Sequence, residues 1–195
     1  MSRALVLLLS MAGCSAGTEG LVRRQGPEYA AEVDSWLRVI DAKGGDGMWL
    51  IVRGYHPGDD TIAVATNSDL SHAAVLDLSH REVIEAVGRG VVVTPLERFV
   101  HESHRVRLVR PDGWSPDVGE VAVARARERV GAKYDYGGIL GMPDQQAFYC
   151  SELAAWSMGI EVDRKGNFEV LHPKHLHDHG TILFDSGPRD GQPDA

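Results

Sequence analysis

The sequence predicts an α+β domain, in which an antiparallel sheet packs against helices that lie mainly before and after it in the chain. Its middle part consists of short runs rich in β-branched residues, separated by polar or glycine turns. The intervals between these runs are too short for the crossovers that parallel strands require. Longer segments with helical periodicity flank the runs on both sides.

Composition is that of one ordinary soluble globular domain. The 195 residues are 43% hydrophobic and 25% charged, which suffices to bury a core without disulfide bonds. The formal net charge is −8, and the arginines are scattered rather than gathered in a basic stripe. Electrostatic binding to nucleic acid or to anionic lipid is therefore not expected, and no cofactor is predicted.

An export signal is predicted at the N-terminus, in "MSRALVLLLSMAGCSAG". Arg3 precedes an apolar run that is shorter than the roughly 20 residues needed to span a bilayer, and small residues follow it. "SMAGC" resembles the lipobox of bacterial lipoproteins, although Met11 replaces the usual leucine. The resemblance implies a signal peptide at 1–13 and lipidation of Cys14, hence an exported cell-envelope protein anchored to a membrane and facing the periplasm or exterior. A plainly cleaved signal and an uncleaved N-terminal helix remain alternatives.

We expect a polar tether at 14–26, the folded domain at 27–187 and a polar tail at 188–195. The domain begins with a helix in "PEYAAEVDSWLRVIDAKGG", where Pro27 suits the first turn and Gly44-Gly45 ends the helix. One apolar face of this helix contains Tyr29, Val33, Trp36, Leu37 and Ile40.

The remaining elements are predicted from the periodicity of apolar residues and from the glycine, proline and polar residues that end helices and strands. Strands are predicted at 48–54, 61–66, 71–78, 82–87, 90–94, 105–110 and 181–186, and a short helix at 95–102. A helix capped at Ser115 runs to Gly131, a Gly/Pro-rich loop follows at 132–148, and a second main helix is expected at 150–159.

Cys150 is the residue most suited to covalent chemistry. A thiol reacts as thiolate, and the N–H groups of a helix N-terminus favour negative charge. A backbone N–H in the same turn could hold a developing oxyanion. A lone cysteine at such a position is also compatible with a small buried hydrophobe, so its partners decide the interpretation.

Two partners are predicted on a hairpin formed by 71–78 and 82–87. A tight turn at Leu78-Ser79 would place His72 directly opposite Glu85 on one face, and a loop of either two or four residues preserves this pairing. A carboxylate bonded to one imidazole nitrogen would leave the other nitrogen free to take the proton of Cys150. A strand-end histidine bonded to backbone and a solvated glutamate are the structural alternatives.

Three stretches carry a resemblance to a known family: "NSDLSHAAVLDL", "EVIEAVGRGVVVTPLERF" and "AKYDYGGI…FYCSELAAW". Together they resemble the circularly permuted NlpC-type papain-like hydrolases, with the YiiX/YebB-like branch the most similar, over residues 48–185. The resemblance implies a papain-like α+β fold with the cysteine helix packed on the sheet. It also implies that Cys150 is the nucleophile, His72 the base and Glu85 the residue that orients the imidazole.

Three tyrosines near the cysteine are candidate substrate-binding or oxyanion residues. Tyr134 and Tyr136 match an aromatic pair common in the family, and Tyr149 precedes the nucleophile. Packing against the core is the alternative for each.

Four histidines in "LHPKHLHDHG" could suggest a metal site: His172, His175, His177 and His179. The side chains of 175, 177 and 179 would share one side only in an extended segment, and apart from Asp178 no thiolate or second carboxylate cluster accompanies the histidines. We expect a solvated loop and no metal.

The predicted function is that of a thiol-dependent hydrolase or acyl transferase acting on amide or peptide bonds, those of peptidoglycan among them. A lipid thioesterase or acyltransferase using the same triad is one alternative. A non-catalytic, lipid-anchored binding domain is the other.

Overall fold

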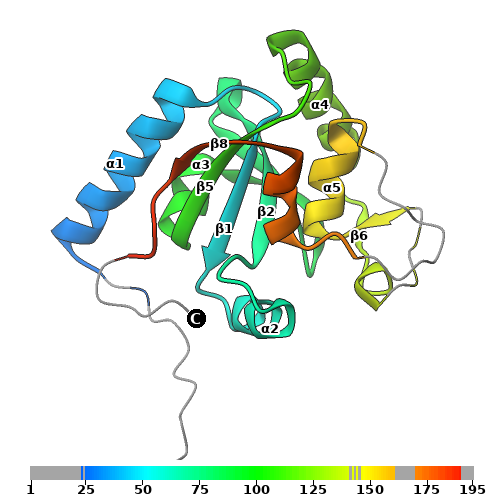
Figure 1. Cartoon of the computed structure of the whole chain (residues 1–195), viewed down its shortest axis with the longest axis horizontal. Helices are drawn as coiled ribbons and strands as arrows, with labels where there is room; N and C mark the ends of the chain where they lie inside the picture. Colours follow the sequence, from blue (N-terminus) through cyan, green and yellow to red (C-terminus); the bar gives the residue numbers. More distant parts are fainter. Residues whose placement is uncertain are drawn as a thin grey trace, which may run out of the picture.

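A six-stranded antiparallel sheet with helices on both faces forms the centre of the computed structural model (Figure 1). The structure describes residues 23, 25–140, 142, 144, 146–160 and 170–189. The predicted signal peptide, Cys14 and most of the tether lie outside the described residues. Within them, no helix combines the length and apolar character needed to cross a membrane.

The sheet has the strand order β4-β3-β2-β1-β5-β8, and every neighbouring pair is antiparallel. The predicted α+β architecture is therefore confirmed. The strands are β1 (Trp49–Gly54), β2 (His72–Asp77), β3 (Glu82–Val87), β4 (Gly90–Pro95), β5 (Ser103–Pro111) and β8 (Gly180–Asp185).

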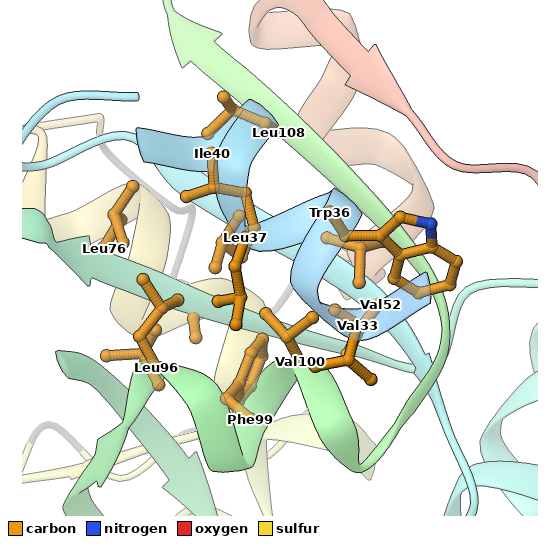
Figure 2. Close-up of a cluster of buried hydrophobic side chains, with 14 of the residues drawn as sticks. Val33, Trp36, Leu37, Ile40, Val52, Leu76, Leu96, Phe99, Val100 and Leu108 are labelled. Carbon is orange, nitrogen blue, oxygen red and sulfur yellow. The ribbon is translucent and has the colours of Figure 1, made fainter. Parts of the chain in front are cut away.

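One face of the sheet is covered by α1 (Pro27–Lys43) and α3 (Leu96–His101). All five residues of the predicted apolar face of α1 are buried. Figure 2 shows four of them, Val33, Trp36, Leu37 and Ile40, in a cluster with Leu76 and Val52 from the sheet and Phe99 from α3. The helix ends at Gly44, as predicted. The N–H of Gly44 makes the last helical bond, to the carbonyl of Ile40, and its backbone then becomes extended with ψ of 169°.

The other face packs against α4 (Pro116–Glu128) and α5 (Cys150–Ser157), which lie side by side (Figure 1). Ser115 caps α4 by accepting a hydrogen bond from the N–H of Val118 at 3.3 Å. The indole N–H of Trp49 on β1 donates to the carbonyl of Ala154 at 3.1 Å, within the core. This bond holds the cysteine helix on the sheet at a defined position.

The predicted strand at 61–66 is wrong, because these residues belong to the helix α2 (Pro57–Thr66). The β-branched residues of this stretch favoured a strand. Start signals just upstream favour a helix instead: a proline in the first turn, followed by Asp59 and Asp60, whose charges suit the positive end of the helix dipole.

Arg189 lies two residues beyond the predicted end of the domain, yet its side chain is buried. Its guanidinium stacks on the rings of Trp36 and Tyr29, at 3.9 and 4.2 Å from their centroids, and pairs with Glu32. Its Nε donates to the carbonyl of Ser103 at 2.9 Å. Arg189 therefore packs with α1 and β5, while residues 190–195 of the predicted tail lie outside the described residues.

Candidate active site

The β2–β3 hairpin brings His72 and Glu85 together, although in a register that differs from the predicted one. Glu85 lies opposite Ala74 rather than His72, and Asp77 lies opposite Glu82, so the loop is formed by residues 78–81 and the pairing is shifted by two residues. A shift of two residues keeps every side chain on its face. His72 is thus a diagonal neighbour of Glu85, and its Nε2 lies 2.6 Å from Oε2 of the carboxylate.

The longer loop has a local cause. Asp77 accepts a hydrogen bond from the N–H of His80, which starts a single 3-10 turn at Leu78–His80. Arg81 then takes a left-handed conformation with φ of 55°, which returns the chain to β3. These side-chain and backbone preferences set the register, and strand pattern alone does not contain them.

Glu85 is a buried carboxylate with a partner on each oxygen. Oε2 faces His72, and Oε1 accepts a hydrogen bond from the hydroxyl of Thr94 on β4. Burial alone would raise the pKa of Glu85, but the bonds from His72 and Thr94 outweigh it and leave the pKa lowered. Glu85 is therefore ionised at neutral pH.

Cys150 is the first residue of α5 and is only 4% exposed. The N–H of Tyr149, just before it, donates to Oε2 of Glu152 at 3.3 Å, which fixes the turn that enters the helix. In an α-helix the N–H groups of the first turn have no carbonyl partner within the helix, and such groups favour a negative charge placed at that end.

His72 connects these two parts of the site. Burial alone would lower the pKa of His72, but hydrogen bonds with Cys150 and Glu85 raise that pKa well above its ordinary value. Because Nε2 is engaged by Glu85, Nδ1 is the ring nitrogen left for the thiol. The ring of Phe99 flanks the imidazole, with 6.1 Å between centroids. The structure thus brings together the three residues that the sequence placed far apart.

The three candidate tyrosines have different surroundings. Tyr134 is partly buried, and burial together with the nearby Cys150 raises its pKa, so its hydroxyl stays protonated. Tyr149 is buried, with its pKa raised to about 12, and its oxygen accepts the N–H of Leu171 at 3.2 Å. Tyr136 is exposed, its ring lies tilted against that of Tyr134 with 4.8 Å between centroids, and its hydroxyl donates to the carbonyl of Gly88 at 3.1 Å.

Asp135 organises the loop that precedes the cysteine helix, a role the sequence analysis did not assign. This buried carboxylate accepts hydrogen bonds from the N–H groups of Gly138 at 2.7 Å and Asp144 at 2.9 Å. The loop also contains a short parallel pair, β6 (Lys133–Tyr134) and β7 (Ala147–Phe148). An aspartate before Tyr-Gly-Gly is a typical start of a side-chain-stabilised turn, and that was the available signal.

Three of the four histidines lie not in the predicted loop but in the 3-10 helix Pro173–His179, in which Pro173 and Leu176 are buried; His172 directly precedes this helix. The ring centroids of His172 and His175 lie 5.5 Å apart, and Nε2 of His177 lies 3.4 Å from Oδ1 of Asp178. Throughout the part of the chain that the structure describes, no group of three or more His, Cys, Asp or Glu side chains is arranged to hold a metal ion.

Comparison with known proteins agrees with this geometry. The model of a family described as permuted papain-like amidase enzymes, YaeF/YiiX, the C92 family, matches residues 56–183, well over half of the chain. The crystal structure of the metalloprotein yiiX from Escherichia coli O157:H7 is similar with a TM-score of 0.57 and 21% identity, covering 72% of this chain and 96% of that one. At this identity the likeness shows the fold alone. Curated protein sequences give no match.

Proposed function

Because this chain belongs to the permuted papain-like amidases of the C92 family, and is therefore a cysteine hydrolase acting on amide bonds, we propose that Cys150 is its nucleophile, with His72 as general base and Glu85 as the residue that orients the imidazole. The observation that supports this proposal most is that His72 interacts with both Glu85 and Cys150. Glu85 bonds one side of the ring at 2.6 Å, and the bond with Cys150 contributes to the raised pKa of His72. A structural histidine needs neither partner.

Acylation requires the proton of Cys150 to lie on Nδ1 of His72, which the raised pKa of His72 favours, and the thiolate then attacks the carbonyl carbon of the substrate. The C–S bond forms, and the carbonyl electron pair moves to oxygen. Backbone N–H groups at the start of α5 stabilise that oxyanion. The imidazolium then gives its proton to the leaving nitrogen as the C–N bond breaks, which releases the amine and leaves a thioester on Cys150.

Deacylation repeats these steps with water. His72 takes a proton from the water as its oxygen attacks the thioester, and the proton returns to sulfur when the C–S bond breaks, which frees the acid. Glu85 stays ionised throughout and stabilises the imidazolium that forms in each half of the reaction. Tyr134, whose protonated hydroxyl lies near Cys150, is the tyrosine best placed to donate to the oxyanion.

We assign cell-wall peptides as the substrate class. The predicted export signal with Cys14 as a lipid anchor would place the domain in the envelope, where peptidoglycan stem peptides supply amide bonds. Esters and thioesters of fatty acids are the competing class, because a thiolate attacks their carbonyl in the same way.

The substrate assignment predicts a clear ranking. The purified chain, offered muropeptides, acyl esters and acyl thioesters in parallel, should release peptide fragments cleaved at an amide bond, as measured by mass spectrometry. A rapidly quenched reaction should show an acyl adduct on the peptide that contains Cys150. Turnover of esters or thioesters without amide cleavage would support the lipid-hydrolase alternative, and no turnover with no adduct would support a binding domain.

A further inference from the structure

The hydroxyl of Thr94 donates a hydrogen bond to Oε1 of Glu85, the carboxylate oxygen that does not face His72. We propose that Thr94 is a positioning residue of the reaction, which holds the carboxylate of Glu85 in the orientation that bonds the imidazole. This inference rests on the proposed roles of Glu85 and His72.

The register of the sheet places Thr94 where it can do this. On β3 and β4, Glu85 lies opposite Val92 and Val83 lies opposite Thr94. Thr94 is therefore a diagonal neighbour of Glu85 on the same face, as His72 is from the other side. The carboxylate lies between two strands, with a donor from each.

Thr94 is itself held firmly. It is only 6% exposed and sits in the strand next to Pro95, which caps α3. The N–H of Leu96 donates to the carbonyl of Arg81 at 2.9 Å, which joins the end of β4 to the turn of the β2–β3 hairpin. A β-branched side chain in a paired strand has few χ1 rotamers, so the hydroxyl has a defined direction.

The reason that Glu85 needs this second donor is torsional. The terminal torsion of a glutamate is broad, so a carboxylate held at one oxygen only can rotate. Two donors on different strands fix its plane. Without the hydroxyl, Oε1 would remain buried with a negative charge and would turn toward another donor, which moves the imidazole away from the thiol.

The test compares three variants at position 94. Thr94→Val keeps the shape and removes the hydroxyl, Thr94→Ala removes it without keeping the shape, and Thr94→Ser retains it. We expect kcat/KM for the amide substrate to fall about tenfold in the valine and alanine variants and to stay within about twofold in the serine variant. Tm values measured in parallel separate this loss from unfolding.

A double-mutant cycle distinguishes positioning from general stabilisation. In a Glu85→Ala background, Thr94→Val should cause no further loss, because Thr94 acts only through the carboxylate. Losses that multiply, a serine variant as impaired as the valine one, or a folded valine variant with wild-type kcat/KM would each overturn the inference. If Glu85→Ala alone keeps wild-type kcat/KM, the proposed role of Glu85 fails first. A loss in Glu85→Ala without one in Thr94→Val overturns only the role of Thr94.

Discussion

Replacing Cys150 with serine should lower kcat/KM for amide hydrolysis by about 10⁴-fold or more, while the fold is retained. Serine is similar in size, and Cys150 is a buried first residue of α5, so little packing is lost. The alcohol does not ionise beside an imidazole as a thiol does, and the attack then starts from a poor nucleophile. The measurement is turnover of the muropeptide substrate, with circular dichroism and Tm as the check on folding.

A matched control lies in the same helix. Ser157 is buried in α5, and its hydroxyl bonds to the carbonyl of Ala154. Ser157→Ala should leave kcat/KM near the wild-type value. A folded Cys150→Ser protein that retains activity would show that another group carries the chemistry, and the proposed mechanism would have to be abandoned.

His72→Gln should lower kcat/KM by about 10³- to 10⁴-fold, because the variant has no group that can take the proton of Cys150 and return it to the leaving nitrogen. Glutamine can still hydrogen bond to Glu85, so the hairpin is expected to fold. Because His72 and Cys150 act as one unit, the double variant should be no slower than the slower single variant.

His179→Gln is the control for this experiment. His179 is exposed and lies at the end of the four-histidine segment, so its loss should not change turnover. Equal losses in both variants, together with inhibition by a chelator, would instead indicate that histidines of this segment hold a required metal.

Most of the fold could be predicted because its signals are local. The five apolar residues of α1 recur at helical spacing, and proline and glycine mark its two ends, so the spacing and the end residues predicted the same helix. The strands β1 to β5 were recognisable for a similar reason, since short β-branched runs alternate with turns. For α2 the local signals conflicted: its β-branched residues indicated a strand, and only Pro57 with the acidic residues after it indicated a helix.

The residues of the site could be predicted from the sequence, but the strand register that positions them could not. The resemblance of the motifs to a known family indicated Cys150, His72 and Glu85. The predicted pairing of the two strands still failed by two residues, because Asp77 and Arg81 make a longer turn than the hydrophobic pattern can reveal. The period of two in a strand preserved the shared face despite this error.

Residues that act through other residues escaped prediction. Thr94 and Asp135 bond to a carboxylate and to backbone amides, and these contacts depend on strand register and loop closure, which sequence spacing does not determine. Arg189 escaped for a similar reason: a charged residue in a polar tail gives no local sign that two aromatic rings of α1 will cover it.

The titration of His72, followed by NMR of its ring nitrogens, tests most directly whether thiol, imidazole and carboxylate form one coupled unit. The account predicts a pKa well above 6.5 in the wild-type chain, falling in both Cys150→Ser and Glu85→Gln. Because the pKa of His72 is raised in the folded chain, the stability that its protonated ring contributes is fully present below the ordinary histidine pKa and is lost as pH rises through the raised pKa. A wild-type His72 that titrates near 6.5, and that neither substitution moves, would contradict the account.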